Sequence, residues 1–255
     1  MSAFDSVVLG FLEGLTEYLP VSSTGHLILG AKILGLESSD FLKTFEIAIQ
    51  LGAILAVVTL YARKFFVSGI YLAKLLLAFL PTAVIGFIFY DYIKQMLGSY
   101  QVVLWSLVIG GLFLIIFEKW YSRRGEEAGD LVSISFSQAF KIGLAQSISI
   151  IHGVSRAAAT IIGGMATGLP RKTAVEFSFL LAVPTMLAAT GLDIFRSASF
   201  IDGRNLLLLA IGFLTSFLIA LASIKFLLGF LNRHSFTTFG YYRIILSFLF
   251  WLVIL

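Results

Sequence analysis

Long apolar runs separated by short polar stretches dominate the pattern of this chain. A helix needs about 20 apolar residues to cross a bilayer. Six runs approach this length, at about residues 44–62, 70–90, 100–119, 174–196, 204–224 and 238–255. The longest polar interval, about residues 119–135, is too short for a separate soluble domain. The pattern predicts an all-α polytopic membrane protein that forms a single domain over residues 1–255.

Two further apolar regions, 5–35 and 136–168, are broken at their centres by polar and helix-breaking residues. The first contains "LPVSSTG" and the second contains "HGVSRAAAT". Halves of roughly 12 to 15 residues are too short to span a bilayer singly. The breaks therefore predict two re-entrant helical hairpins, with one kinked span as the alternative in each case.

Composition agrees with a membrane protein and excludes several other classes. The chain is 59% hydrophobic with 13% charged residues, against about 25% charged residues in soluble domains. The absence of cysteine excludes disulfides and thiolate metal sites. The net charge of +4 does not form a basic face interleaved with aromatic residues, so no nucleic-acid partner is expected. The N-terminus lacks the basic segment of a signal peptide, and no cleavage is expected.

Basic residues are distributed unevenly between the predicted loops, with twelve on one side and five on the other. The larger group is Arg63, Lys64, Lys74, Lys119, Arg123, Arg124, Lys141, Arg171, Lys172, Lys225, Arg233 and Arg243. The smaller group is Lys32, Lys43, Lys94, Arg196 and Arg204. The bias predicts that the first side is cytoplasmic. Both termini then face outward, and the two hairpins enter the membrane from opposite sides.

The two broken regions also resemble each other in sequence. At a constant offset of 133 the pairs are Gly10 and Gly143, Glu13 and Gln146, Val21 and Val154, and Ser22 and Ser155. Three predicted spans separate the regions, and an odd number reverses their orientation. We therefore predict an inverted-topology repeat, about 1–119 and 136–255, with the polar breaks together near the bilayer midplane.

The stretch "EGLTEYLPVSSTGH" concentrates polar side chains in the first break. Glu13 and Glu17 share one helical face and repel each other if both are ionised. An ionised side chain at the bilayer centre costs about 2.5–3.5 kcal/mol. A bound cation or a shared proton would explain the pair. The alternative is that the hairpin lies near the outer surface and both carboxylates contact water.

Hydroxyl groups and a histidine follow Pro20. Ser22, Ser23 and Thr24 have the character of an N-cap that opens a second helix, and such helix ends favour phosphates. Alternatively, these hydroxyls only satisfy backbone groups that the break leaves free. His26, beside the carboxylates and hydroxyls, is a candidate general acid or base.

The second break contributes Arg156, whose guanidinium presents a fork of donors suited to phosphate oxygens. If the inverted repeat is correct, Arg156 projects toward the first break. Carboxylates, hydroxyls and an arginine together predict a metal-assisted site for a phosphorylated substrate. Glu46 and Glu176 are either helix-end residues or supporting partners of this site.

The motif "EGLTEYLPVSSTGHLIL" resembles the undecaprenyl-diphosphatase family, integral membrane phosphatases associated with bacitracin resistance. The resemblance extends over the chain through "GVSRAAAT" and "GLPRKTAVEFSFLLAVPTM". It implies hydrolysis of a C55 polyprenyl diphosphate to the monophosphate and inorganic phosphate, which recycles the lipid carrier for cell-wall synthesis. It also implies a divalent cation, expected to be Mg²⁺ or Ca²⁺, and the inverted-repeat fold with two hairpins. We expect a multi-pass protein of the cell membrane, and the basic-residue bias predicts that its active site opens outward.

The family motifs match this chain at most of their positions. The acidic pair matches Glu13 and Glu17, the expected metal ligands. The hydroxyl cluster and histidine match Ser22, Ser23, Thr24, Gly25 and His26. The second motif, usually PGxSRSGxT, matches at Gly153, Ser155, Arg156 and Thr160. Three positions depart from it: His152, Ala157 and Ala158 replace Pro, Ser and Gly, which puts substrate preference and rate in doubt.

These matches define a mechanistic hypothesis. Arg156 and the free N–H groups of both breaks orient the phosphates, and Glu13 and Glu17 hold the cation. The hydroxyl of Ser23 attacks the terminal phosphorus with His26 as general base, and Ser22 or a metal-activated water are competing nucleophiles. Contacts to the substrate are expected from Thr24, Gly25, Gly153, Ser155 and Thr160.

Other functions remain open at this stage. Inverted repeats and broken helices are also typical of secondary transporters, so an alternating-access transporter or lipid-phosphate flippase is the main alternative. The departures in "HGVSRAAAT" leave a catalytically inactive paralogue as a third. Gly110-Gly111 is suited to close helix packing either within one chain or in a homodimer.

Overall fold

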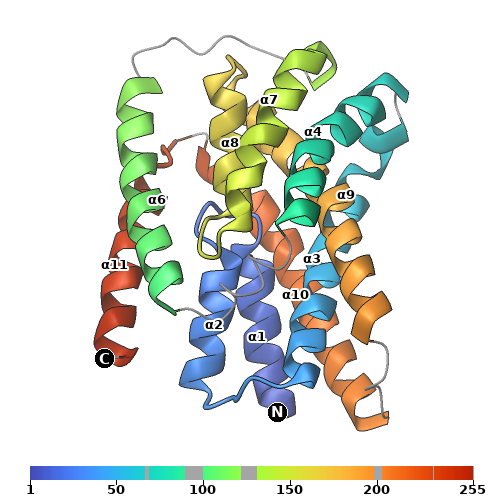
Figure 1. Cartoon of the computed structure of the whole chain (residues 1–255), viewed down its shortest axis with the longest axis vertical. Helices are drawn as coiled ribbons and strands as arrows, with labels where there is room; N and C mark the ends of the chain where they lie inside the picture. Colours follow the sequence, from blue (N-terminus) through green and yellow to red (C-terminus); the bar gives the residue numbers. More distant parts are fainter. Residues whose placement is uncertain (67–68, 90–99, 122–130, 198–202, 232, 255) are drawn as a thin grey trace.

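A computed structural model describes the chain except residues 67–68, 90–99, 122–130, 198–202, 232 and 255 (Figure 1). Its long helices are α3 (Asp40–Phe66), α4 (Gly69–Ile88), α6 (Tyr100–Tyr121), α9 (Arg171–Ser197), α10 (Gly203–Leu231) and α11 (Thr237–Ile254). The described residues contain no strand. The protein is therefore all-helical, as predicted.

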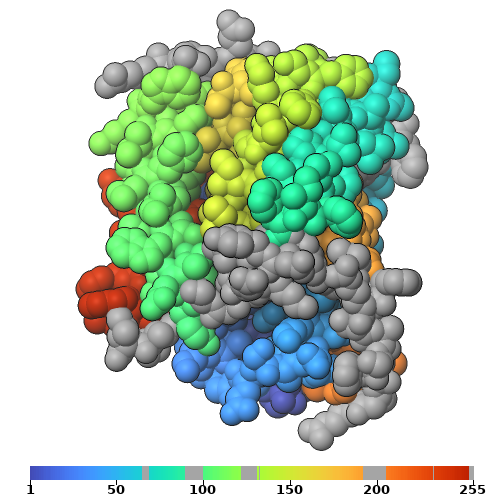
Figure 2. Space-filling model, in the orientation of Figure 1, coloured from blue at the N-terminus to red at the C-terminus, as the bar shows by residue number. Residues whose placement is uncertain are grey.

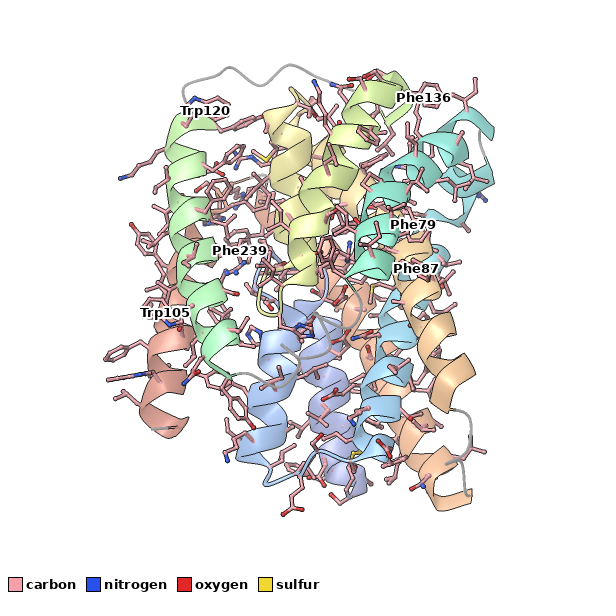
Figure 3. The ribbon with its side chains drawn as sticks, in the orientation of Figure 1. Phe79, Phe87, Trp105, Trp120, Phe136 and Phe239 are labelled. Carbon is pink, nitrogen blue, oxygen red and sulfur yellow. The ribbon has the colours of Figure 1, made fainter. Side chains whose placement is uncertain are left out.

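Five of these helices, α3, α4, α6, α9 and α10, are long and apolar enough to cross a membrane. Each coincides with one of the six predicted runs. The sixth run is α11, an 18-residue helix that packs along α6. Large apolar side chains lie on the outside of the helices, as expected for contact with lipid: Phe87 is 82% and Trp105 is 67% exposed (Figure 3).

Both broken regions form pairs of short helices. The first pair is α1 (Ala3–Thr16) with α2 (Ser23–Ile33), and the second is α7 (Phe136–Ser147) with α8 (Arg156–Ala166). Short 3-10 turns at Leu131–Ser133 and Ile148–Ile150 flank α7. In Figure 1, α1 and α2 extend toward the end where both termini lie, and α7 and α8 extend toward the opposite end. The two breaks consequently meet near the middle of the molecule.

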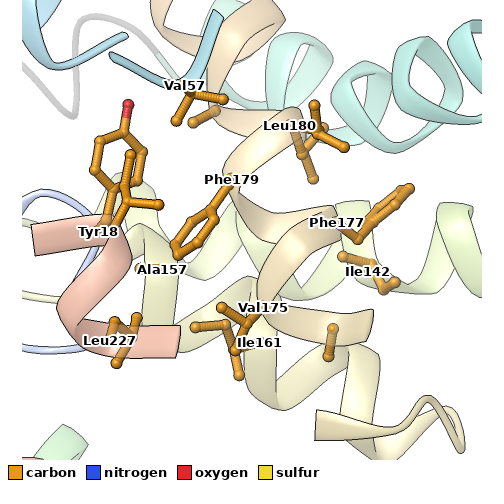
Figure 4. Close-up of a cluster of buried hydrophobic side chains, with 14 of the residues drawn as sticks. Tyr18, Val57, Ile142, Ala157, Ile161, Val175, Phe177, Phe179, Leu180 and Leu227 are labelled. Carbon is orange, nitrogen blue, oxygen red and sulfur yellow. The ribbon is translucent and has the colours of Figure 1, made fainter. Parts of the chain in front are cut away.

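The interior around α9 is a continuous apolar core. Phe177, Phe179 and Leu180 are fully buried and pack with residues from both hairpins, including Tyr18 and Ile161 (Figure 4). The Tyr18 hydroxyl donates to the Ala53 carbonyl at 2.8 Å. This core fixes the first hairpin against α3 and α9, and so fixes the position of its break.

Arg243 does not lie in the loop to which the sequence assigned it. Arg243 is only 1% exposed and contacts the interior breaks, so assigning it to the cytoplasmic side was wrong. Without it the bias is eleven against five. Three of the counted residues, Lys94, Arg123 and Arg124, lie outside the described part of the chain, and the side chains of Arg196 and Arg204 are also not described. The remaining bias still favours the predicted orientation.

A buried ion pair joins α6 to the start of α9. Arg171 Nη2 lies 2.5 Å from Glu118 Oε1, with side chains that are 13% and 5% exposed. Changing Glu118 to Gln is expected to lower the free energy of unfolding by about 3 kcal/mol, because neutralising one partner of a buried ion pair is strongly destabilising. Thermal unfolding in detergent measures this.

The matched control is Asp40→Asn. Asp40 pairs with Lys43 at 3.3 Å, but both side chains are more than 60% exposed. Exposed pairs contribute little because water screens them, so this variant should unfold like the wild type. Equal destabilisation by both substitutions would contradict a special contribution from the buried pair.

Candidate active site

The backbone at both breaks opens a new helix with a serine cap. Ser22 precedes α2 with φ +71°, and its Oγ accepts from Gly25 N at 3.3 Å. Ser155 precedes α8, and its Oγ accepts from Ala158 N at 3.1 Å. The predicted N-cap at the first break is therefore confirmed. Each cap leaves the N-terminal N–H groups of its helix directed into the break.

The two breaks are in direct contact. The Ser155 hydroxyl donates to the Leu19 carbonyl at 3.4 Å, across 136 residues of sequence. Gly153, with φ +89°, lies so close to α6 that a Cβ would approach Ser106 Cβ to 2.8 Å. Glycine is required there both for the backbone conformation and for the close approach.

Glu17 is the centre of the polar contacts. Its Oε1 accepts from Arg156 Nη2 at 3.0 Å and from Arg156 Nε at 3.3 Å. Its Oε2 accepts from the Ser23 hydroxyl at 2.5 Å. The Arg156 and Glu17 side chains are 11% and 7% exposed. The structure thus brings one carboxylate, one hydroxyl and the guanidinium into a single cluster, which joins the two broken regions.

Arg156 is held from behind by α9. Its Nη1 donates to the Ser178 carbonyl at 3.1 Å. Thr160, one turn further along α8, bonds the Arg156 carbonyl at 2.9 Å and the Ser178 hydroxyl at 2.6 Å. Thr160 therefore supports the arginine and has its hydroxyl occupied by these protein partners. Thr24 lines the cavity described below, and Gly25 serves as the capped N–H donor.

Glu13 lies one helical turn before Glu17 and is fully buried. Neither of its carboxylate oxygens has a hydrogen-bond partner among the described residues. A buried carboxylate without partners is costly unless it is neutralised. Mg²⁺ and Ca²⁺ prefer oxygen ligands, and Mg²⁺ is often held by one or two carboxylates together with substrate phosphates. Glu13 and Glu17 fit such a cation, although the described residues contain no group of three metal-binding side chains.

His26 does not contact Ser23 by hydrogen bonding in this structure. Its Nδ1 lies 2.7 Å from the Ser22 carbonyl, and its Nε2 lies 2.7 Å from the Tyr242 hydroxyl. A carbonyl only accepts, so Nδ1 carries the proton and Nε2 of the neutral ring accepts from Tyr242. The Ser23 hydroxyl is therefore hydrogen-bonded to Glu17, while His26 contacts Ser22 and Tyr242. The role of His26 as general acid or base stays a prediction.

A small polar cavity lies at the cluster. Its volume is about 180 Å³, and it is lined by Glu17, Ser22, Ser23, Thr24, Gln50, Ser149, Val154, Ser155, Arg156 and Met186. A second cavity of about 1640 Å³ is lined mainly by apolar residues of α6, α8 and α11. On the face shown in Figure 2, α6 runs beside α7 and α8, which border this cavity. Val154 lines both cavities, so they adjoin.

The departures from the second motif leave the cluster intact. Ala157 is fully buried in the apolar core beside Tyr18 and Ile161, as Figure 4 shows. Ala157 and Ala158 are not among the residues that line the polar cavity. The replacement of serine by Ala157 therefore removes no hydroxyl from the wall of the polar cavity.

Two further carboxylates named from the sequence lie outside the cluster. Glu176 pairs with Lys64, in the last turn of α3, at 2.6 Å, and Glu46 is half-buried on α3.

Sequence reasoning missed two residues of α11 that contact the site. Tyr242 bonds His26, and Arg243 bonds backbone carbonyls of both breaks. An arginine within an apolar run of spanning length is itself a signal of a functional residue. That signal was available for Arg243, which lies within the predicted run 238–255, but Arg243 was counted with the basic residues of the preceding loop.

Fold and site together define a multi-pass helical membrane protein with a buried arginine–carboxylate pair and a hydroxyl cluster at the junction of two broken regions. The family model described as "Bacitracin resistance protein BacA" matches residues 6–249. The chain belongs to this family.

Similar proteins cover the chain from end to end. A protein from Persephonella marina named undecaprenyl-diphosphatase is 50% identical over 255 residues, all of both chains. Proteins with the same name from Aquifex aeolicus and Bdellovibrio bacteriovorus are 49% and 44% identical, over 97% of this chain and 96% and 94% of their own.

Proposed function

We propose that this protein is an undecaprenyl-diphosphatase, which hydrolyses the phosphoanhydride of undecaprenyl diphosphate and leaves the monophosphate and inorganic phosphate. The single observation that carries the proposal is the cluster of Glu17, Ser23 and Arg156 at a polar cavity that adjoins a long apolar one. The names of its full-length relatives support the same activity. The product would re-enter cell-wall synthesis as the lipid carrier.

The diphosphate binds at the polar cavity. Arg156 offers its fork of N–H donors to the phosphate oxygens, and the N-termini of α2 and α8 add free backbone N–H groups and their positive dipole ends. The polyprenyl chain lies in the adjoining apolar cavity. The polar cavity and the apolar cavity meet at Val154. This pairing of a charged surface with an apolar one matches the charged head and apolar tail of a lipid diphosphate.

The nucleophile is the Ser23 hydroxyl. As its oxygen bonds to the terminal phosphorus, its proton passes to Glu17 Oε2, already 2.5 Å away. The bond from the bridging oxygen to that phosphorus breaks, and the lipid monophosphate leaves. Water then hydrolyses the phosphoserine and restores the hydroxyl. Arg156 stabilises the charge that develops on the transferred phosphoryl group.

Glu13, with Glu17 beside it, would hold a divalent cation, Mg²⁺ or Ca²⁺. Such an ion neutralises phosphate oxygens and offsets the burial of two neighbouring carboxylates. The unpartnered oxygens of Glu13 support this assignment.

The topology that best accommodates the site is an inverted repeat with α11 as a sixth span and two re-entrant hairpins. Gly10 and Gly143, matched at the offset of 133, support it because they have equivalent neighbours. A Cβ on Gly10 would meet the Gly212 carbonyl of α10, and a Cβ on Gly143 would meet the Ala78 carbonyl of α4. The basic-residue bias supports an orientation in which the first hairpin, and the opening of the site, lie on the outer side of the cell membrane.

Purified protein in detergent is expected to release phosphate from a long-chain polyprenyl diphosphate in Mg²⁺ or Ca²⁺, and to lose most of this activity in EDTA. The physical reason is that the Glu17 carboxylate, which lines the polar cavity, and the substrate phosphates repel each other unless a cation lies between them. Phosphate release is measured over time with each ion and with the chelator.

The same assay separates an enzyme from a carrier. Detergent removes both compartments, so an alternating-access carrier gives no net reaction there. A folded protein without turnover in either cation would contradict the proposed activity, and lipid translocation in vesicles would become the assay of choice.

A further inference from the structure

Arg243 is the most deeply buried charged side chain that the proposed chemistry does not use. It is 1% exposed, and no ion pair among the described residues includes it. Its guanidinium donates to the Ser106 carbonyl at 2.9 Å, to the Gly153 carbonyl at 3.0 Å and to the Pro20 carbonyl at 3.4 Å. Its Nε is buried without a hydrogen-bond partner among the residues that the structure describes.

Stability alone is a poor explanation for this arrangement. Burying an unpaired charge costs several kcal/mol, and an apolar residue of similar volume would often serve the fold better. An ionisable residue within an apolar span is by default a sign of function. The bonds to backbone carbonyls offset part of this cost and also fix the place of the guanidinium.

The partners of Arg243 come from the two halves of the proposed site. Pro20 lies between Glu17 and Ser23 in the first break, and Gly153 lies three residues before Arg156 in the second. Carbonyls at such breaks lack intrahelical donors and need partners from elsewhere. One planar, rigid group therefore contacts both breaks. Two other contacts between the breaks are the Arg156 to Glu17 bonds and the 3.4 Å bond from Ser155 to Leu19.

The neighbouring helix is shaped to receive this side chain. A Cβ on Gly110 of α6 would overlap Arg243 Nη2. The next residue, Gly111, faces the Gly240 carbonyl of α11 and allows the two helices to approach closely. Gly110 and Gly111, which the sequence suggested for helix packing either within one chain or between two, therefore pack within the chain. Gly110 makes room for the guanidinium of Arg243.

We propose that Arg243 is a positioning residue that sets the two breaks in register, so that Arg156 of one repeat meets Glu17 of the other. This inference rests on the proposed function and assigns no direct contact with the reacting atoms. Displacements of about 1 Å at a reacting centre can cost about 10²-fold in rate. A guanidinium that ties Pro20 to Gly153 limits such displacements.

The test begins with Arg243→Met and Arg243→Lys. In Arg243→Met, kcat per folded molecule is expected to fall by about 10²-fold. Arg243 also lines the tail cavity, so KM can change as well, and the fall in kcat at saturating substrate is the readout. Arg243→Lys keeps the charge but cannot reach three carbonyls with a planar fork, so it should recover only part of the loss.

Gly110→Ala supplies a second test that keeps every donor of Arg243. The added Cβ displaces Nη2, so kcat should fall in the same direction. In the Arg243→Lys background the same substitution should cause less further loss, because lysine has no Nη2 to displace. Gly229→Ala is the matched control, since a Cβ there has no neighbour within 4 Å, and its kcat should equal that of the wild type.

A distance measurement separates this proposal from the proposed function. The chain has no cysteine, so spin labels at Ile33→Cys and Lys141→Cys, both exposed positions on the two hairpins, report their relative placement. A broadened or shifted distance distribution in Arg243→Met supports the proposed positioning role of Arg243. A wild-type protein that releases no phosphate would contradict the proposed function, but not this result. Unchanged distances, or unchanged kcat with only a lower thermal midpoint, would overturn the proposal.

Discussion

Arg156→Ala is expected to lower kcat/KM for phosphate release by about 10³-fold, the lower end of what a phosphate-binding arginine contributes in phosphoryl transfer. Two effects act together. The transferred phosphoryl group loses its fork of donors, and Glu17 loses the partner that holds its Oε1. Initial rates across substrate concentrations measure the loss, and Arg156→Lys should regain a minor part because it restores charge without the fork.

Arg233→Ala is the matched control for this prediction. Arg233 is an exposed basic residue just beyond α10, away from the breaks, so removing it changes net charge by the same amount. Its kcat/KM should stay at the wild-type value. If Arg156→Ala, well folded by its unfolding midpoint, also retained wild-type turnover, the assignment of the phosphate site to the junction of the two breaks would be wrong.

Ser23→Ala is expected to reduce phosphate release by at least about 10⁴-fold, the scale seen when a nucleophile or its partner is removed from covalent enzymes. The reason is that the substitution deletes the oxygen that attacks phosphorus, while Glu17 and Arg156 remain. Steady-state turnover gives the loss. Mass spectrometry of wild-type protein quenched during turnover should detect a phosphate on the peptide that contains Ser23, and none in the variant.

Ser135→Ala controls for the loss of a serine that caps a helix. Ser135 Oγ accepts from Gln138 N at 3.1 Å at the start of α7, far along the helix from the break. Its removal should cost about 1 kcal/mol of stability and leave kcat unchanged. Full turnover by Ser23→Ala would show instead that water attacks the phosphorus directly, with Glu17 as its base.

Much of the helical layout followed from local chemistry. The apolar run at 100–119 predicts α6 (Tyr100–Tyr121) because span length is set by the bilayer. The cap at Ser22 was predictable because it depends on the few residues around it. Ser155 has the same function at the equivalent position of the second repeat. The nearness of Arg156 to Glu17 also followed, from the inverted order of the repeats.

The identity of the base for Ser23 could not be read from the same residues. Adjacent side chains on a helix point about 100° apart, and the orientation of the cluster depends on Ser22, whose φ of +71° is rare outside glycine. In that conformation the Ser23 hydroxyl donates to Glu17, and the His26 ring bonds the Ser22 carbonyl and the Tyr242 hydroxyl. Both ring nitrogens of His26 are bonded to groups other than Ser23 in this structure, and its role as general base stays a prediction.

The sequence by itself determined an all-helical membrane protein, the places where two helices break, and the polar residues that gather at those breaks, because hydropathy, span length and capping act over short distances. Only the tertiary structure decided which of these residues touch. Glu17 and Arg156 are 139 residues apart, and Pro20 and Arg243 are 223 apart. Such contacts depend on how α6, α9 and α11 pack around the breaks, where small glycines and rigid turns fix atomic positions that no local pattern specifies.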